Sequence, residues 1–166
     1  MVNISRAGAE LYCKWLTDEC NKVNTKKGQT LINNIRIPSR TEWVFAATAG
    51  GKQQPYPWDG AEVRNSEGCY LANFKPESQN FHVDGAFITA NVTSYFSSAR
   101  GLYCLSGNVS EMVYNSNTDR SNPGTIGGNW TSTEEEIKLL ADDPYAGVMD
   151  GKPTIGFRVV VTTLAK

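Results

Sequence analysis

This 166-residue sequence contains four cysteines and one histidine, the side chains from which disulfides or a zinc site would be built. Cys13 and Cys20 fall on one predicted helix, two turns apart, which places their Cα atoms roughly 10 Å from each other. That separation exceeds the ~7 Å that a disulfide can bridge. There is no C-x-x-C pair and His82 is the one histidine, so a zinc site is not expected. We predict that all four cysteines are reduced, and that most act as small buried hydrophobes: Cys13, Cys20, Cys69 and Cys104.

An arginine near the C-terminus is predicted to have a structural role. Arg158 follows a Gly-Phe turn, and such an arginine usually belongs to a buried, hydrogen-bonded ion pair. Glu111 is its natural partner if no metal is bound there. Trp58 and Trp130 are predicted core aromatics, and His82 is predicted to be exposed in a polar loop.

Two helices and two strands must position these residues. Ser5 can cap a helix running to about Asn21, followed after a polar loop by a short strand at residues 35–37. The helix is expected to bury a face made of Ala9, Tyr12, Cys13, Leu16 and Cys20.

A second helix has the clearer local signal. Ser39 and Glu42 form a capping box, in which each side chain accepts a hydrogen bond from a free backbone N–H of the first turn. This helix is predicted to run through Ala47 and to stop at Gly50 and Gly51. Residues 155–161 are rich in β-branched side chains and predict a buried strand.

Between residues 51 and 98 the sequence has little periodicity and many Gly, Pro and Asn residues. A long irregular region in a compact domain needs something to hold it in place. A bound ion or a set of buried aromatics would serve: Tyr56, Trp58, Phe74, Phe81 and Phe87. The pattern predicts one α+β domain over residues 1–166 with few regular elements and long ordered loops.

Charge and hydropathy exclude two classes of partner. Sixteen basic residues stand against seventeen acidic ones with no basic run, so nucleic acid is not expected as a partner. No apolar stretch approaches the length of a membrane span. We also expect any signal or lipoprotein segment to lie outside this sequence.

Seven motifs in order resemble the formylglycine-generating-enzyme (sulfatase-modifying factor) family, which has a C-type-lectin-like fold. The motifs cover nearly the whole sequence and are the opening helix with Y-C-K-W-L, R-I-P-S-R-T-E-W at 36–43, Y-P-W at 56–58, N-F at 73–74, G-N-V-S-E-M at 107–112, G-G-N-W at 127–130 and G-F-R at 156–158. The resemblance starts partway into the family pattern. We therefore expect the family's N-terminal strands to be missing from this sequence or supplied by another segment.

The resemblance also implies what a catalytic member would contain. Such enzymes hold copper with two cysteines at positions that correspond here to Ser132 and Ile137. A hydroxyl and a hydrocarbon cannot replace the soft thiolates that Cu(I) requires. We therefore expect no copper and no enzymatic activity, unless a loop brings Cys69 and Cys104 together as a substitute pair. Residues 131–140 instead predict a helix start, with three glutamates in its first turn and apolar Ile137, Leu139 and Leu140.

Structural calcium sites are also implied by the resemblance. The first would use the side chains of Asn73 and Asp84 with the carbonyls of Phe74 and Ala86. The second would use the carbonyls of Gly107 and Val109 with Glu111, although Cys104 stands where the family has an oxygen ligand. The alternative is that Asp84 simply forms a turn with Gly85, and that Glu111 accepts backbone N–H bonds.

The segment V-R-N-S-E-G-C-Y-L-A-N-F-K-P at residues 63–76 resembles the non-catalytic modules of gliding-motility and type IX secretion lipoproteins. This predicts a structural or protein-interaction module of a bacterial cell envelope, periplasmic or outer-membrane-associated, with other envelope proteins as partners. A lectin-like ligand-binding domain of the diversified variable-protein type is the alternative, with residues 131–152 as its binding surface. A formylglycine-generating oxidase is the third hypothesis.

Overall fold

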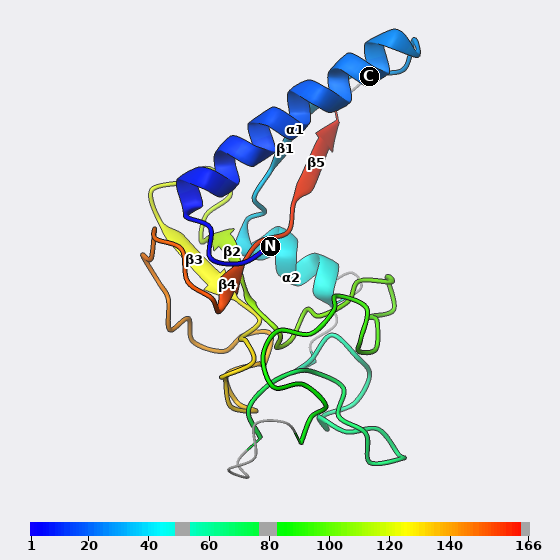
Figure 1. Cartoon of the computed structure of the whole chain (residues 1–166), viewed down its shortest axis with the longest axis vertical. Coiled ribbons are helices and arrows are strands. Elements are labelled where there is room, and N and C mark those ends of the chain that lie inside the picture. The colour runs from blue at the N-terminus through cyan, green and yellow to red at the C-terminus, as the bar shows by residue number, and fades with distance from the viewer. Residues whose placement is uncertain (49–53, 77–82, 164–166) are drawn as a thin grey trace.

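The computed structural model describes residues 1–48, 54–76 and 83–163. Its regular elements gather in one half of the molecule, and long loops make up the other half (Figure 1). The mixed α+β class and the C-type-lectin-like fold expected from the sequence are both confirmed. The predictions for Gly50, Gly51, Phe81 and His82 lie outside the described residues.

The first helix, α1, spans Arg6–Lys26 and is capped by Ser5, whose hydroxyl accepts a hydrogen bond from the Gly8 N–H at 3.1 Å. Its predicted buried face is confirmed in part, since Ala9 and Cys13 are buried and Tyr12, Leu16 and Cys20 are half-buried. The helix ends five residues later than predicted because no helix-breaking residue follows until Gly28. Asn21 does not end the helix. Its side chain instead bonds both backbone groups of Ile32, joining α1 to the next strand.

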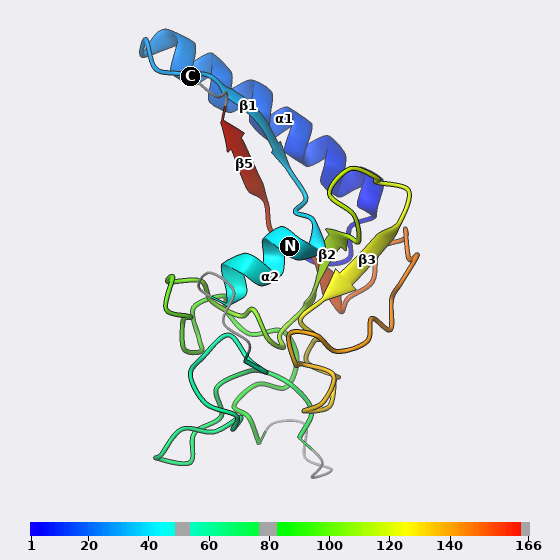
Figure 2. The same ribbon diagram turned by 180° about the vertical axis from the view of Figure 1, so that it is seen from behind.

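Strand β1 spans Ile32–Arg36 and pairs antiparallel with β5, Val160–Thr163. α1 lies along this two-stranded sheet, which projects from the rest of the molecule in both ribbon views (Figures 1 and 2). Thr17 of α1 accepts the Ile35 N–H at 2.8 Å, so the helix also satisfies a backbone donor of β1.

Helix α2, Arg40–Ala47, begins at the predicted capping box. The Ser39 hydroxyl accepts the Glu42 N–H at 3.2 Å, and the Glu42 carboxylate accepts the Ser39 N–H at 2.8 Å. Trp43 and Ala47 form the buried face of the helix. The local prediction is confirmed because both halves of the box lie within four residues.

A three-stranded sheet in the order β3–β2–β4 forms the centre of the molecule. It consists of β2, Ser110–Tyr114, β3, Pro123–Ile126, and the two-residue β4, Ile155–Gly156. β2 pairs antiparallel with β3 and parallel with β4.

The single strand predicted at residues 155–161 was wrong. The chain pairs with β2 at Ile155 and Gly156, then leaves that sheet and pairs with β1 from Val160 onward. Because two different sheets share the segment, the ladder is interrupted at residues 157–159. Val161 is 54% exposed, so the second half is not a buried strand either.

Three hydrophobic clusters form the core. One joins α1 to β2 through Ala9, Cys13 and Met112, and the second joins α2 to β2 through Trp43 and Val113. The third lies among the loops and includes Tyr56, Phe74 and Ile137. Successive β2 side chains thus enter different clusters, as the alternation of a strand requires.

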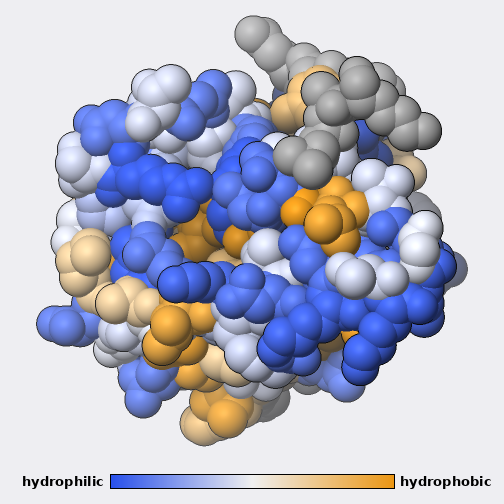
Figure 3. All heavy atoms as spheres, turned by 90° about the horizontal axis from the view of Figure 1, so that it is seen from above, coloured by the Kyte–Doolittle hydropathy of each residue, from blue (hydrophilic) through white to orange (hydrophobic). Residues whose placement is uncertain are grey.

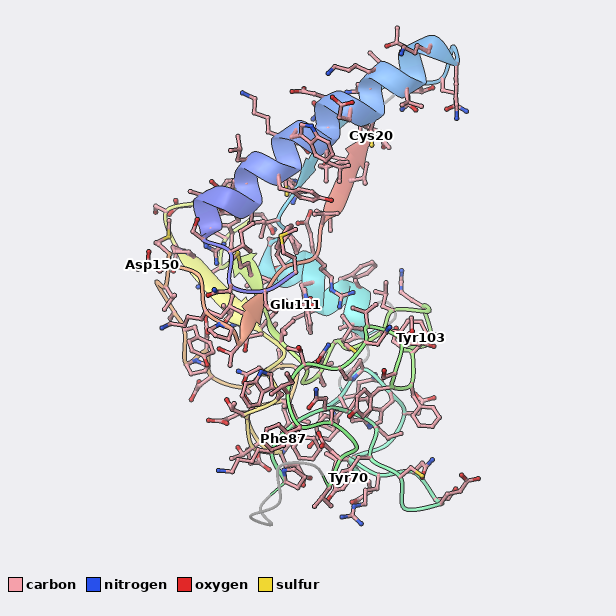
Figure 4. The ribbon with its side chains drawn as sticks, in the orientation of Figure 1. Cys20, Tyr70, Phe87, Tyr103, Glu111 and Asp150 are labelled. Atoms are coloured by element: carbon pink, nitrogen blue, oxygen red, sulfur yellow. The ribbon has the colours of Figure 1, made fainter. Side chains whose placement is uncertain are left out.

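The loop half contains no helix or strand of more than bridge length between residues 54 and 109 within the described ranges. Tyr56 and Phe74 are buried as predicted, and Trp58 stacks on Tyr56 with the ring centroids 4.8 Å apart. The prediction for Phe87 was wrong. It is 70% exposed and lies among the outer loops (Figure 4).

All four cysteines are free, as predicted. Their expected burial was only partly right: Cys13 is buried, Cys20 and Cys104 are half-buried and Cys69 is exposed. Cys69 closes a turn in which its N–H bonds the Asn65 side chain, and this turn leaves the thiol at the surface. On the face of the molecule seen from above in Figure 3, the hydrophobic side chains form separate patches between hydrophilic ones.

Candidate functional site

The Gly127–Gly128–Asn129 turn holds the region where the family's reactive cysteines would lie. Both glycines have positive φ, and a Cβ on Gly128 would come within 2.9 Å of the Glu136 carbonyl oxygen. Asn129 is buried and donates to the Ser110 hydroxyl at 3.0 Å, while its side-chain oxygen accepts from the Thr131 N–H at 2.9 Å. The turn is therefore packed directly against the segment that follows it.

Ser132 and Ile137, the two positions expected to carry cysteines in a catalytic relative, both point into the protein. The Ser132 hydroxyl accepts the Asn129 N–H at 3.1 Å, and the residue is 4% exposed. Ile137 is fully buried in the cluster with Tyr56 and Phe74. Neither side chain supplies a soft ligand, so the residues present do not fit a copper centre.

The helix predicted for residues 131–140 was wrong, because the segment forms a series of turns. Its start is helix-like: the Glu136 carboxylate accepts the Thr133 N–H at 2.7 Å, and the Ile137 N–H reaches the Thr133 carbonyl. The Leu139 N–H then donates to the carbonyl of Pro55 instead of to a residue one turn back. Tertiary contacts thus take the backbone groups that a helix would use.

The predicted ion pair between Arg158 and Glu111 is confirmed. Arg158 donates two hydrogen bonds to the carboxylate, from Nε to Oε2 and from Nη2 to Oε1, the latter at 2.6 Å. Trp43 Nε1 donates to the same carboxylate at 2.6 Å. Burial alone would lower the pKa of Arg158, but the charge and hydrogen bonds of Glu111 outweigh burial and raise it. Glu111 lies in the middle of the molecule, where β2 and β4 meet (Figure 4).

This ion pair bears on the second calcium set, Gly107, Val109 and Glu111. The carboxylate of Glu111 already faces a guanidinium and an indole N–H, so a calcium ion would have to displace Arg158. Gly107 is held by its own packing, since a Cβ there would lie 2.1 Å from the Asn73 carbonyl oxygen. The set does not fit calcium in this arrangement.

The structure brings the first calcium set together in one loop. Asp84 accepts the Phe74 N–H at 2.7 Å and the Ala86 N–H at 3.3 Å. Asn73 donates to the Ile88 carbonyl at 2.8 Å, which leaves its side-chain oxygen as an acceptor. The oxygens of this set are the ligand type that calcium prefers, so the set fits calcium, which stays a prediction.

Of the two remaining candidate thiols, Cys104 lies in an environment that disfavours its thiolate form. Cys104 donates to the Val92 carbonyl, and burial, with the nearby Glu111 charge, raises the pKa of its thiol. A raised pKa lowers the thiolate fraction and so the reactivity. Cys69 is exposed in its turn, and both thiols are free.

Sequence reasoning missed two buried residues that make structural contacts, Trp43 and Arg6. Trp43 shares the Glu111 carboxylate, and nothing in the sequence links positions so far apart. Arg6 is 1% exposed at the start of α1. Extending the predicted buried face of the helix back three positions from Ala9 would have placed Arg6 on it.

A cavity of about 1010 Å³ borders the surface that the lectin-like hypothesis assigned to binding. Its wall combines Val44 of α2, Thr48 at the end of that helix and residues 54–55 with charged and apolar residues between 135 and 144. Leu140 lines it and is 76% exposed. Neither helix of the described part has both the length and the apolar character needed to cross a membrane.

Comparisons with known proteins agree with this fold. Chaperone protein LppX of Paenibacillus barcinonensis is 27% identical over 142 residues, which cover 77% of this chain and 49% of that protein. The chain thus spans about half the length of this curated relative.

Solved structures show the same architecture at low identity. PvdO of Pseudomonas aeruginosa matches 98% of this chain and 61% of its own, with a TM-score of 0.65 and 22% identity. CarF matches 99% of this chain and 67% of its own, with a TM-score of 0.61 and 20% identity. Treponema denticola variable protein 1 matches 80% of this chain and 50% of its own, with a TM-score of 0.59 and 19% identity.

The family model described as the sulfatase-modifying factor enzyme 1-like domain matches residues 1–163, almost the entire sequence. Its extent agrees with the motif order, the central β3–β2–β4 sheet and the Gly127–Gly128 turn. The chain therefore belongs to the sulfatase-modifying factor enzyme 1-like family.

Proposed function

We propose that this domain is a non-catalytic protein-interaction module of a bacterial cell-envelope assembly. The observation that carries the proposal is that residues 132 and 137 are buried and that neither has a thiol. A buried serine hydroxyl and a fully buried isoleucine occupy the positions expected to hold a copper-binding thiol pair. Copper-dependent oxidation needs two thiolates open to metal and substrate at this place.

Packing around these positions supports a scaffold role. Ser106 donates to the Ile137 carbonyl at 2.7 Å, and Lys75 donates its N–H to the Ser132 carbonyl at 2.8 Å. Both contacts join distant loops through the backbone of this segment. The segment therefore connects the loops of this half of the molecule, and its side chains are closely packed instead of lining an open reaction site.

The interaction part and the envelope part of the proposal rest on one likeness each. The relative from Paenibacillus barcinonensis is named a chaperone, and a chaperone acts on other proteins. The segment at residues 63–76 resembles modules of gliding-motility and type IX secretion lipoproteins. We infer other envelope proteins as partners and a periplasmic or outer-membrane-associated location.

An oxidase assay tests the non-catalytic part directly. The purified protein is incubated with a cysteine-containing peptide, copper and oxygen, and the peptide mass is followed over time. We expect no conversion of the peptide thiol beyond a protein-free control. Turnover of the peptide by the purified protein would overturn the proposal.

A copper titration with a matched variant sharpens this test. In the double variant Ser132→Cys, Ile137→Cys, two thiols stand at the family positions, and we expect Cu(I) to bind there. The unaltered protein is expected to lack this site. Equal Cu(I) stoichiometry in both proteins, with Cys69 and Cys104 replaced by serine in each, would contradict the assignment.

The interaction part needs the full-length protein in its native cells. We expect crosslinking followed by membrane fractionation to recover it with envelope proteins. Recovery in the cytoplasmic fraction without crosslinked partners would refute the envelope role.

The cavity beside residues 135–144 favours a second candidate, a ligand-binding lectin-like domain. A glycan or protein array would test it with Leu140→Ser, which changes an exposed residue of the cavity wall. Leu11→Ser is a matched control, since Leu11 is 68% exposed on α1, away from that cavity. Specific binding lost only in Leu140→Ser would favour this candidate.

A further inference from the structure

The cavity of about 1010 Å³ next to residues 135–144 is an open groove with two connected walls. One wall comes from Val44 of α2, Thr48 and Pro55, and the other comes from residues 135–144. The Leu139 N–H donates to the Pro55 carbonyl at 2.8 Å, which joins the two walls. The shape of the groove therefore depends on contacts between distant segments and not on a single loop.

Part of the groove surface is apolar and exposed to solvent. Leu140 is 76% exposed, and Pro55, Ala141 and Pro144 also line the groove. An apolar side chain of a ligand that covered Leu140 would remove apolar area from water, and this is favourable. The groove therefore matches a ligand with a large apolar group.

The same groove is acidic. Its lining contains four carboxylates and one lysine: Glu135, Glu136, Asp142, Asp143 and Lys138. Lys138 is already paired with Glu135 at 2.6 Å, and no described cation lies within ion-pair distance of the other three carboxylates. Three negative charges around one concave surface create a negative potential there, which favours a cationic ligand.

Two of these carboxylates can still accept hydrogen bonds from a ligand. Asp143 is occupied by the N–H of Thr125, at 2.6 Å, and by the hydroxyl of the same residue, so it holds its own loop. Glu136 accepts the Thr133 N–H through Oε2 at 2.7 Å, and its Oε1 has no described donor. Asp142 is exposed. Asp142 and Glu136 are therefore the acceptors that a cation would meet.

The pKa of a nearby tyrosine supports a negative potential at the groove. Tyr56 follows Pro55 in the chain and is fully buried. Burial is the largest cause that raises the pKa of Tyr56, and the negative charges of Glu134 and Glu135 raise it further. The charges of the second wall are thus felt on the Pro55 side of the groove.

These properties separate the classes of ligand that could bind. Anionic groups, such as phosphates, are repelled by the carboxylates. The described lining contains no aromatic side chain, so a sugar ring would find no aromatic face to pack against. A basic polypeptide segment with large apolar residues supplies both a cation and an apolar side chain.

We propose that this groove binds a partner protein through a short basic segment that also contains large apolar residues. Lysine or arginine side chains of the segment donate to Asp142 and Glu136, and an apolar side chain packs against Leu140. The proposal rests on the protein-interaction role inferred above and names the chemistry of the partner at this groove.

Three synthetic peptides test the two requirements separately, with calorimetry and ¹H–¹⁵N chemical-shift changes as the readouts. They are acetylated, amidated pentapeptides with the sequences K-L-K-L-K, E-L-E-L-E and K-S-K-S-K. The first is expected to bind at least ~10-fold more tightly than either of the others, with shift changes in residues 135–144. Because the contact is partly ionic, its binding should weaken as salt is raised from about 0.05 to 0.5 M. Equal binding of all three peptides, or no binding of the first, would overturn the proposal.

Two pairs of variants locate the site. Asp142→Lys is expected to weaken binding of K-L-K-L-K at least ~10-fold. Asp150→Lys is its control, since Asp150 is exposed and does not line the groove. Leu140→Ser is expected to weaken binding roughly 5-fold, whereas Leu11→Ser, at a position 68% exposed on α1, should leave it unchanged. The same loss in a variant and in its control would contradict the site.

A gain of binding guards against a variant that merely fails to fold. Asp142→Lys is expected to bind E-L-E-L-E more tightly than the unaltered protein does, which an unfolded variant could not do specifically. Thermal unfolding checks that every variant is folded before binding is measured. A glycan whose binding is lost in Leu140→Ser but kept in Asp142→Lys would overturn the proposal in favour of the lectin-like candidate. The protein-interaction role fails by a different result, the absence of crosslinked envelope proteins in native cells.

Discussion

At the scale of single residues, the carboxylate of Glu111 connects three parts of the chain. It accepts hydrogen bonds from Trp43 on α2 and from Arg158 near the C-terminus, and it is itself part of β2. The pair is largely buried, with side-chain exposures of 25% for Arg158 and 7% for Glu111. Breaking such a pair leaves an uncompensated charge inside the protein.

We therefore predict that Glu111→Gln lowers the free energy of unfolding by about 3 kcal/mol. Urea denaturation at neutral pH measures the change. Glu19→Gln is the control, because the Glu19–Lys22 pair is exposed and should change stability by less than about 0.5 kcal/mol. A loss in Glu111→Gln as small as that of the control would show that the pair does not stabilise the fold.

At the scale of elements, two segments with similar helix-start signals have different structures. The capping box of α2 forms because its partners are three residues apart. Residues 131–140 have equally good helix-start signals. However, the Leu139 N–H donates to the carbonyl of Pro55, and the Ile137 carbonyl accepts from the hydroxyl of Ser106. The segment therefore turns instead of continuing as a helix.

The α2 capping box gives a pH-dependent prediction. Hydrogen bonds from Arg36, and then from the Ser39 N–H, lower the pKa of Glu42 to about 2. Because the folded pKa lies below the unfolded value of 4.5, this stabilisation is full above about pH 4.5 and is lost as the pH falls toward 2.

We expect Glu42→Gln to cost about 1 kcal/mol of unfolding free energy at pH 6, after allowance for its partial exposure, and almost nothing near pH 2. Denaturant unfolding of both proteins across this pH range tests it. Glu67→Gln, an exposed turn position, is the control. A Glu42→Gln cost that stays constant from pH 6 to pH 2 would contradict the assignment.

At the scale of the whole molecule, β2 joins clusters that would otherwise be separate. Met112 and Tyr114 belong to the cluster under α1, and Val113 between them belongs to the cluster under α2. All five residues of the strand are buried. The third cluster is linked to these through the backbone contacts of the Gly127–Gly128 turn. Stability of the loop half therefore depends on the sheet.

Val113→Ala should accordingly lower the free energy of unfolding by about 2 kcal/mol, since the side chain is fully buried and would leave a cavity. Val161→Ala is the matched control. Val161 is 54% exposed on β5, and its loss should change stability by less than about 0.5 kcal/mol. Similar effects of the two substitutions, measured by thermal unfolding, would show that β2 is not the centre of the core.

The sequence by itself determined the fold class, the α1 and α2 caps, the free cysteines and the partner of Arg158. The caps depend on neighbouring residues, and the ordered family motifs indicate the fold class. Tertiary structure alone decided the division of residues 155–161 between two sheets, the turns at 131–140 and the exposure of Phe87 and Cys69. It also buried Arg6 at the start of α1. These outcomes depend on which distant backbone groups and side chains meet, and a single sequence does not encode that pairing in its local pattern.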